Sequence, residues 1–218
     1  MRLKHDEYKH FRIATLFSLL LVLLLGIFVA IYGKNRSFLV INGNYSNEAD
    51  YFFNYVTLLG EWVLWVPIFF YAIIIKRDFF IPVLTALIIC TLLTHLGKRV
   101  IFEGEPRPLR LLEDAARAVP ILEHNNYVNS FPSGHTSTAF TTALLLSFIT
   151  RRKFAVFFFP VIAFLVGYSR VYLAQHFVTD VLAGSVIGII SSYCALLIHN
   201  HFQEKKRQIQ QEPSPQDG

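Results

Sequence analysis

The residues best suited to chemistry in this chain lie within positions 169–180, which combine a serine, an arginine, a histidine and an aspartate. His176 and Asp180 are four residues apart, so on a helix they share one face. A carboxylate placed there accepts the N–H of the imidazole and leaves the other ring nitrogen with its lone pair. This arrangement prepares a histidine for nucleophilic or acid–base chemistry.

A break in the helix is expected between Arg170 and His176. On an unbroken helix, their spacing of six residues places the two side chains roughly 120° apart. They can face one anion only if the chain turns between them, near Ala174 or Gln175. The alternative interpretation of positions 169–180 is a polar loop that joins two membrane helices, and the stretch alone leaves both open.

Two further segments carry groups that complement this pair. Lys98 and Arg107 are cations, and an arginine fork matches phosphate oxygens while a lysine adds a mobile point charge. Ser133 and Gly134 follow a proline at a predicted helix start, where free backbone N–H groups and the helix dipole attract an anion. His135 directly follows Gly134 and therefore lies at the same helix start. Together these residue types predict a phosphate site.

The side chains predict a phosphoryl transfer in two steps. A neutral His176, oriented by Asp180, attacks phosphorus in line and becomes a phosphohistidine, while a protonated His135 donates to the leaving oxygen and then activates water. The charge on the equatorial oxygens is stabilised by the phosphate-binding residues Lys98, Arg107, Ser133, Gly134 and Arg170. Because these groups supply the stabilisation, we expect no metal and no cofactor. The acidic residues of the intervening loop are interpreted as solvated charges: Glu103, Glu105, Glu113 and Asp114.

The composition indicates a membrane protein. Hydrophobic residues make up 54% of the chain and charged residues 16%, and the mean hydropathy is +0.45. An ordinary soluble domain is less apolar. The net charge of +5 does not indicate nucleic-acid binding, because most cations flank apolar segments. Cys90 and Cys194 both lie in apolar segments, so a disulfide framework is not expected.

Six apolar segments approach the roughly 20 residues that a membrane helix needs. They cover residues 13–32, 54–75, 79–96, 134–150, 154–172 and 180–198. Trp62 and Trp65 are expected as interfacial anchors, with Glu61 at the membrane boundary. The expected fold is all-α, a polytopic membrane protein with six transmembrane helices in one bundle. We expect residues 1–202 to form this six-helix bundle, a membrane phosphatase domain, and residues 203–218 to form a disordered cytoplasmic tail.

The positive-inside rule orients these six spans. One face collects twelve of the twenty Lys and Arg residues, namely Arg2, Lys4, Lys9, Arg12, Lys76, Arg77, Arg151, Arg152, Lys153, Lys205, Lys206 and Arg207. We therefore expect both termini in the cytoplasm and the candidate site on the periplasmic or extracytoplasmic face. The compact architecture favours a bacterial inner membrane.

The motifs resemble those of the type 2 phosphatidic acid phosphatase superfamily, which includes vanadium haloperoxidases. Its pattern is Lys-x6-Arg-Pro, then Pro-Ser-Gly-His, then Ser-Arg-x5-His-x3-Asp. Residues 132–135 and 169–180 match the second and third motifs without a gap. The first motif departs from the pattern, because eight residues separate Lys98 from Arg107. Arg99 therefore competes with Lys98 as the first cation.

This resemblance implies a membrane lipid phosphatase that acts through a phosphohistidine and binds lipid phosphates within the bilayer. Candidate substrates are undecaprenyl pyrophosphate, phosphatidylglycerol phosphate, phosphatidic acid and lipid A phosphates. A lipid phosphotransferase that uses the same residues is the first alternative, and a non-catalytic transporter or scaffold is the second. Gly184 and Gly188 are predicted to pack against another helix beneath the site. His95 receives no role, and His124 is a candidate headgroup contact.

Overall fold

The computed structural model describes residues 8–113, 115–119 and 127–211, and every regular element among them is a helix. Four segments are long and apolar enough to cross a membrane: Lys9–Asn42, Arg77–Ile101, Ala155–Tyr172 and Val178–Gln208. A bent helix pair within residues 47–74 makes five if the pair counts as one span. The expectation of an all-helical membrane protein is confirmed, but the count of six spans is not reached.

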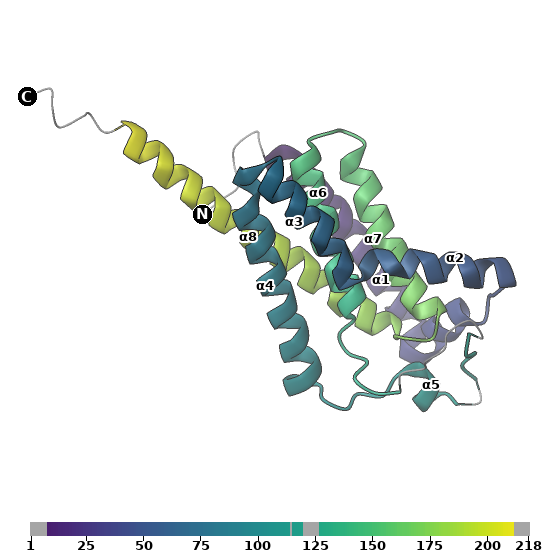
Figure 1. Cartoon of the computed structure of the whole chain (residues 1–218). Helices are drawn as coiled ribbons and strands as arrows, with labels where there is room; N and C mark the ends of the chain where they lie inside the picture. Colours follow the sequence, from purple (N-terminus) through teal and green to yellow (C-terminus); the bar gives the residue numbers. More distant parts are fainter. Residues whose placement is uncertain (1–7, 114, 120–126, 212–218) are drawn as a thin grey trace, which may run out of the picture.

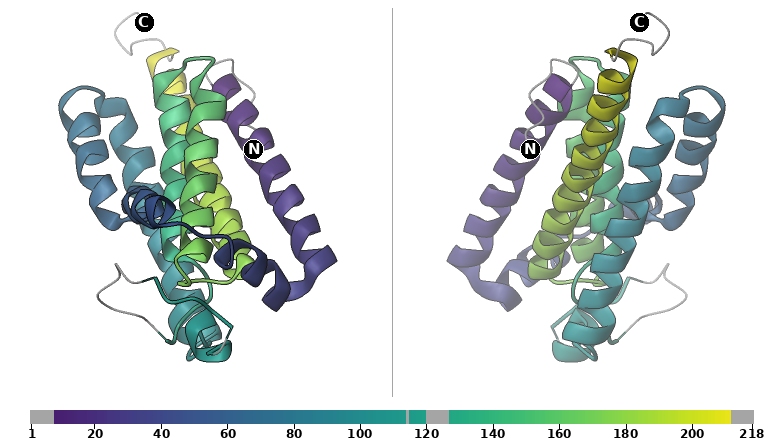
Figure 2. Two further views of the ribbon diagram at one scale, coloured as in Figure 1. Left: turned by 90° about the vertical axis from the view of Figure 1, so that its right-hand side faces the viewer. Right: turned by 90° about the vertical axis from the view of Figure 1, so that its left-hand side faces the viewer.

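The fourth expected span is the central helix of the fold. This helix, α6 (Gly134–Thr150), has 17 residues and packs most extensively against α7 (Ala155–Tyr172) and α8 (Val178–Gln211). At about 26 Å it is slightly shorter than the roughly 30 Å hydrocarbon core of a bilayer. Figure 2 shows α1 (Lys9–Asn42) on one flank of this centre and α4 (Phe80–Leu96) on the other.

The expected second span is wrong as a single helix. The chain forms α2 (Asn47–Thr57) and α3 (Trp65–Ile74), which two short 3-10 turns connect with a bend of 54° (Figure 1). Glu61 lies between the turns with an extended backbone, φ −75° and ψ 153°. Gly60 explains part of the break, because a Cβ there would lie 2.8 Å from the carbonyl oxygen of His135. The chain bends where it meets the start of α6.

The first helix is longer than the expected span of 13–32. It continues to Asn42 across a kink at Gly33, whose φ of +76° suits glycine. The helix then ends at Asn42, directly before Gly43. The short segment after the kink adds Phe38 and Ile41 to a second apolar cluster beneath the loops.

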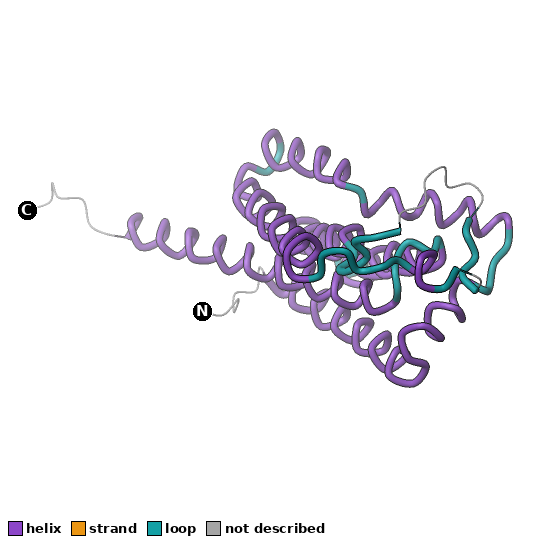
Figure 3. Tube along the Cα trace, turned by 90° about the horizontal axis from the view of Figure 1, so that it is seen from below, coloured by secondary structure: helices purple, strands orange, loops and turns teal. Residues whose placement is uncertain are grey.

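The two ends of the bundle differ in what they carry. At one end, Tyr8 stacks on Phe148, and Phe148 also contacts Phe79 and His199, so the starts of α1 and α4 meet the end of α6 and the second half of α8. The opposite end holds the short helix α5 (Pro108–Leu111) and the loops before α6 and α8 (Figures 2 and 3). The three sequence motifs therefore lie at the same end.

The predicted packing of the two glycines in α8 is confirmed. A Cβ on Gly184 would lie 2.5 Å from the carbonyl oxygen of Ser133, and one on Gly188 would lie 2.6 Å from Cβ of Phe140. Glycine at both positions lets α8 approach α6 directly below the candidate site.

The helix α8 continues beyond the expected boundary at residue 202 and ends at Gln211. Residues 203–211 are therefore helical, where a disordered tail was expected. Lysine, arginine, glutamate and glutamine are good helix formers, and the Asn200 side chain donates to Glu204 Oε1 over 2.9 Å. Composition favoured disorder, but the preceding span supplies a helix for these residues to extend.

Candidate active site

The expected break between Arg170 and His176 is present. The helix α7 ends at Tyr172 and α8 begins at Val178. Ala174 adopts a left-handed conformation, with φ +56°, and the backbone N–H groups of Gln175 and His176 both donate to the carbonyl of Arg170. This turn places His176 at the head of α8, as predicted.

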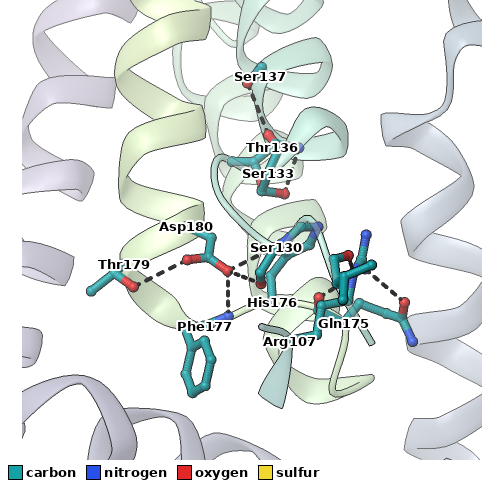
Figure 4. Close-up of polar contacts among 11 residues, drawn as sticks. Arg107, Ser130, Ser133, Thr136, Ser137, Gln175, His176, Phe177, Thr179 and Asp180 are labelled. Atoms are coloured by element: carbon teal, nitrogen blue, oxygen red, sulfur yellow. Dashed lines mark hydrogen bonds and ion pairs between the residues drawn. The ribbon is translucent and has the colours of Figure 1, made fainter. Parts of the chain in front are cut away.

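His176 and Asp180 are in contact (Figure 4). Nδ1 of His176 lies 3.3 Å from Oδ2 of Asp180, and both side chains are buried. The same carboxylate oxygen accepts from the Ser130 hydroxyl at 2.5 Å and from the Phe177 backbone N–H at 3.0 Å. A carboxyl oxygen that accepts hydrogen bonds from several donors belongs to an ionised carboxylate. Nδ1 of His176 therefore donates, and Nε2 carries the lone pair.

His176 is 1% exposed, and its environment keeps it neutral. Burial lowers the pKa of His176 to about 3, and the hydrogen bond and charge of Asp180 oppose that effect only in part. The histidine is thus uncharged at neutral pH, as a nitrogen nucleophile must be.

Ser133 joins the second motif to the third. Its backbone N–H donates to the carbonyl oxygen of Asp180 over 3.1 Å. Its hydroxyl caps α6, because it accepts from the Thr136 hydroxyl at 2.9 Å and from the Thr136 N–H at 3.4 Å (Figure 4). The start of α6 is therefore fixed beside the first turn of α8.

Arg107 lies against the turn that carries His176. Its Nη1 donates to the backbone carbonyl of Gln175 at 3.0 Å and to the side-chain oxygen of Gln175 at 3.1 Å, and its Nε donates to Val128 O at 3.0 Å. Burial lowers the pKa of Arg107, and the charge of Asp180 opposes this shift. These bonds fix the guanidinium and keep it in place as a charge near Asp180.

Arg170 is 8% exposed and points its guanidinium into the protein. Its Nη1 donates to the hydroxyl of Thr57, at the end of α2, over 2.7 Å. Within the described residues its Nε is buried and has no hydrogen-bond partner. A buried guanidinium with a free donor is suited to an anionic ligand.

The structure distinguishes Lys98 from its competitor. Residues Gly97–Ile101 form a π-helical turn after α4, and this wider turn accommodates extra residues of the first motif. Lys98 is partly buried and lies within electrostatic range of Arg107, Arg170 and Asp180, whereas Arg99 is exposed. Lys98 is thus the residue grouped with the other cations.

His135 and Gly134 line a cavity of about 280 Å³ between the bent segment, α4 and α6. Nε2 of His135 lies 3.5 Å from Oε1 of Glu61, which lines the same cavity. His95, to which the sequence assigned no role, is also a lining residue. His124 lies outside the described residues.

Four residues of this site were missed by sequence reasoning: Thr57, Glu61, Ser130 and Gln175. Gln175 lies inside the 169–180 segment and Ser130 lies two residues before the 132–135 motif, but their partners are distant in the chain, so spacing does not identify them. Glu61 carried a signal, because an acidic residue within an apolar segment marks a functional position. Its assignment to the membrane boundary obscured that signal.

Several known proteins resemble this chain in sequence. The model of the PAP2 superfamily matches residues 79–204. A lipid A 4'-phosphatase of Porphyromonas gingivalis is 29% identical over 163 residues, which are 72% of this chain and 69% of that protein. An undecaprenyl-diphosphatase of Sulfolobus acidocaldarius is 27% identical and covers 86% of this chain and 92% of its own.

The fold agrees as well. The crystal structure of Aquifex aeolicus LpxE superposes with a TM-score of 0.67 at 32% identity, over 75% of this chain and 94% of that chain. The family match covers more than half of the chain and contains all three motifs. This chain therefore belongs to the PAP2 superfamily.

Proposed function

We propose that this protein is an integral membrane lipid phosphatase that hydrolyses a phosphomonoester or diphosphate through a phosphohistidine at His176. The observation that carries the proposal is the contact of Asp180 Oδ2 with His176 Nδ1 at 3.3 Å. This contact leaves Nε2 as the nucleophile, beside the cations Lys98, Arg107 and Arg170. A nucleophile and its electrostatic stabilisers thus meet in one place.

In the first step, the lone pair of His176 Nε2 forms the bond to phosphorus and the P–O bond to the lipid breaks. The leaving oxygen takes a proton from His135. In the second step, neutral His135 accepts a proton from water, water oxygen bonds to phosphorus, and the P–N bond breaks. Inorganic phosphate leaves and His176 regains its lone pair. Ser133 and Gly134 at the start of α6 complete the phosphate site.

Metal independence is part of the proposal. The charged side chains that surround His176 and His135 include Lys98, Arg107 and Arg170, and such a cation-rich set repels a divalent metal. The described residues bring together no group of three or more His, Cys, Asp or Glu side chains that could hold one. Activity should therefore persist in excess chelator, and restoration by an added metal after chelation would contradict this part.

The relatives and the family resemblance together define the substrate class to test. A panel of lipid A phosphates, undecaprenyl pyrophosphate, phosphatidylglycerol phosphate and phosphatidic acid is assayed for phosphate release with wild type, H176A and H135A. We expect near-complete loss in both variants with every substrate that wild type accepts. With labelled substrate, quenched wild type should carry alkali-stable, acid-labile phosphate on His176. Label on another residue would overturn the mechanism.

The same assay separates the alternative functions. A phosphotransferase would release little inorganic phosphate, and it would pass the phosphoryl group to an acceptor lipid when one is added. A transporter or scaffold would keep its full function in H176A. Convergence of the three motifs favours hydrolysis over the scaffold, because a scaffold has no need of the His176–Asp180 contact.

We further propose six membrane crossings, with the bent segment and α6 each counting as one. Both termini then lie on the cytoplasmic side of a bacterial inner membrane, and the active site faces the opposite side. Single cysteines at exposed Glu103 and exposed Arg152, in a background without Cys90 and Cys194, test this arrangement. An impermeant maleimide should label position 103 in intact cells and position 152 only after lysis. The reverse pattern would contradict the orientation.

A further inference from the structure

The break in the second apolar segment brings a carboxylate to the second histidine. Oε1 of Glu61 lies 3.5 Å from Nε2 of His135, within ion-pair range. The two side chains are 38% and 28% exposed, and both border the cavity of about 280 Å³. They are therefore open to a ligand in that cavity.

The backbone around Glu61 fixes this contact. Gly60 lies so close to α6 that a Cβ would be 2.9 Å from Cβ of His135. Trp62 in the second 3-10 turn and Trp65 at the start of α3 also line the cavity. A carboxylate within an apolar membrane segment costs free energy, so its presence there indicates a functional role.

His135 needs an anion because its other neighbours are cations. It lies within electrostatic range of Arg170 on α7, Lys98 on the π-helical turn and Arg107 on the loop, as well as His176. His95 on α4 lines the same cavity. Like charges disfavour an imidazolium, and a carboxylate at 3.5 Å favours it.

We propose that Glu61 is a positioning residue that binds His135 through Nε2, holds it as an imidazolium and leaves its Nδ1–H for the leaving oxygen. This inference rests on the proposed phosphatase function. When the P–O bond breaks, the oxygen takes the Nδ1 proton, and His135 becomes neutral while its Nε2–H still faces Glu61. Asp180 holds His176 through Nδ1, so the two carboxylates bind opposite nitrogens of the two histidines.

The sharpest test uses leaving groups of different acidity. An alkoxide needs a proton as it departs, whereas p-nitrophenolate does not. In E61Q, kcat/KM for a dialkylglycerol phosphate should fall on the order of 100-fold, and kcat/KM for p-nitrophenyl phosphate should fall by less than about tenfold. The fall should be in kcat, with KM little changed. The alkaline limb of the pH profile for the alkyl substrate should shift to lower pH, because the imidazolium loses its partner.

E103Q is the matched control, since it makes the same change in charge at an exposed residue of the loop after the π-helical turn. It should match wild type with both substrates. E61D, which retains the carboxylate, should recover part of the alkyl-phosphate activity. Equal loss on both substrates, or an unchanged pH profile in a folded E61Q protein, would overturn the inference. A wild-type protein that is inactive on every phosphate would instead contradict the proposed function.

Discussion

The backbone N–H of Ser133 donates to the carbonyl oxygen of Asp180 over 3.1 Å, which ties the first turn of α6 to the first turn of α8. Both histidines depend on this bond. His135 is on α6, two residues beyond Ser133, and His176 is held by the side chain of Asp180. The proposed proton donor His135 and the proposed nucleophile His176 are thus positioned by one hydrogen bond between α6 and α8.

The Ser130 hydroxyl gives the first prediction. It donates to Asp180 Oδ2 over 2.5 Å in a buried position. A hydrogen bond to a charged group contributes about 1.5–3 kcal/mol, so S130A should lower kcat roughly 10- to 100-fold by loosening Asp180 and His176. The phosphate-release assay measures this. S185A removes a buried hydroxyl that, among the residues that the structure describes, donates to Val181 O within α8, and it should retain near-normal activity. Equal loss in both variants would contradict a specific role for Ser130.

The second prediction concerns the approach of α8 to α6. In G188A, the new Cβ would lie 2.6 Å from Cβ of Phe140 and 2.7 Å from the carbonyl oxygen of Ser137. Such overpacking costs about 1–3 kcal/mol, so the melting temperature in detergent should fall by several degrees. Among the described residues, no atom outside its own stretch of α1 lies within 4 Å of the Cβ position of Gly26, so G26A should not lower the melting temperature. An unchanged melting temperature in G188A would show that the helices separate freely.

The third prediction is a pH dependence of stability. The pKa of His176 is about 3 in the folded protein, against an ordinary value of 6.5. Between these values the unfolded chain binds a proton that the folded protein does not, so stability falls as pH falls below 6.5. The slope is about 1.4 kcal/mol per pH unit, and the effect is absent above pH 6.5. Melting temperatures at pH 7.5 and 5 should therefore differ more in wild type than in H176Q. Identical differences would contradict a buried neutral histidine.

The sequence was sufficient for the parts of the site that depend on local spacing. His176 and Asp180 lie four residues apart, and Ser133 directly precedes a helix start, so their relative positions follow from helix geometry. The bend at Glu61 was not predictable from hydropathy, because the apolar segment continues on both sides of it. The close contact of Gly60 with His135 accounts for part of the bend, and only the tertiary structure reveals it. The position of Lys98 near the other cations was not predictable either, because it depends on a π-helical turn that the spacing rules for an α-helix do not describe.

A cluster beside the site carries the last prediction. Asp50 on α2 is 2% exposed and forms a bidentate ion pair with Arg117, and it also accepts from the Tyr172 hydroxyl at 2.6 Å. Tyr172 ends α7, two residues after Arg170, and Arg117 also stacks over Tyr45. The cluster therefore connects the loop that carries Arg117 to the helix end that carries Arg170, which is proposed to bind phosphate.

The pair is partly buried, because the Arg117 side chain is 19% exposed and the Asp50 side chain 3%. R117M leaves the buried carboxylate uncompensated and should destabilise the protein by about 3 kcal/mol, and D50N should cost less because water reaches the remaining guanidinium. The double variant should lose less than the sum of the two, because neither charge remains. Thermal melts of the four proteins give the coupling energy, and KM for a lipid phosphate reports whether Arg170 has moved. Additive losses with unchanged KM would mean that Asp50 and Arg117 stabilise the protein independently and do not support the site.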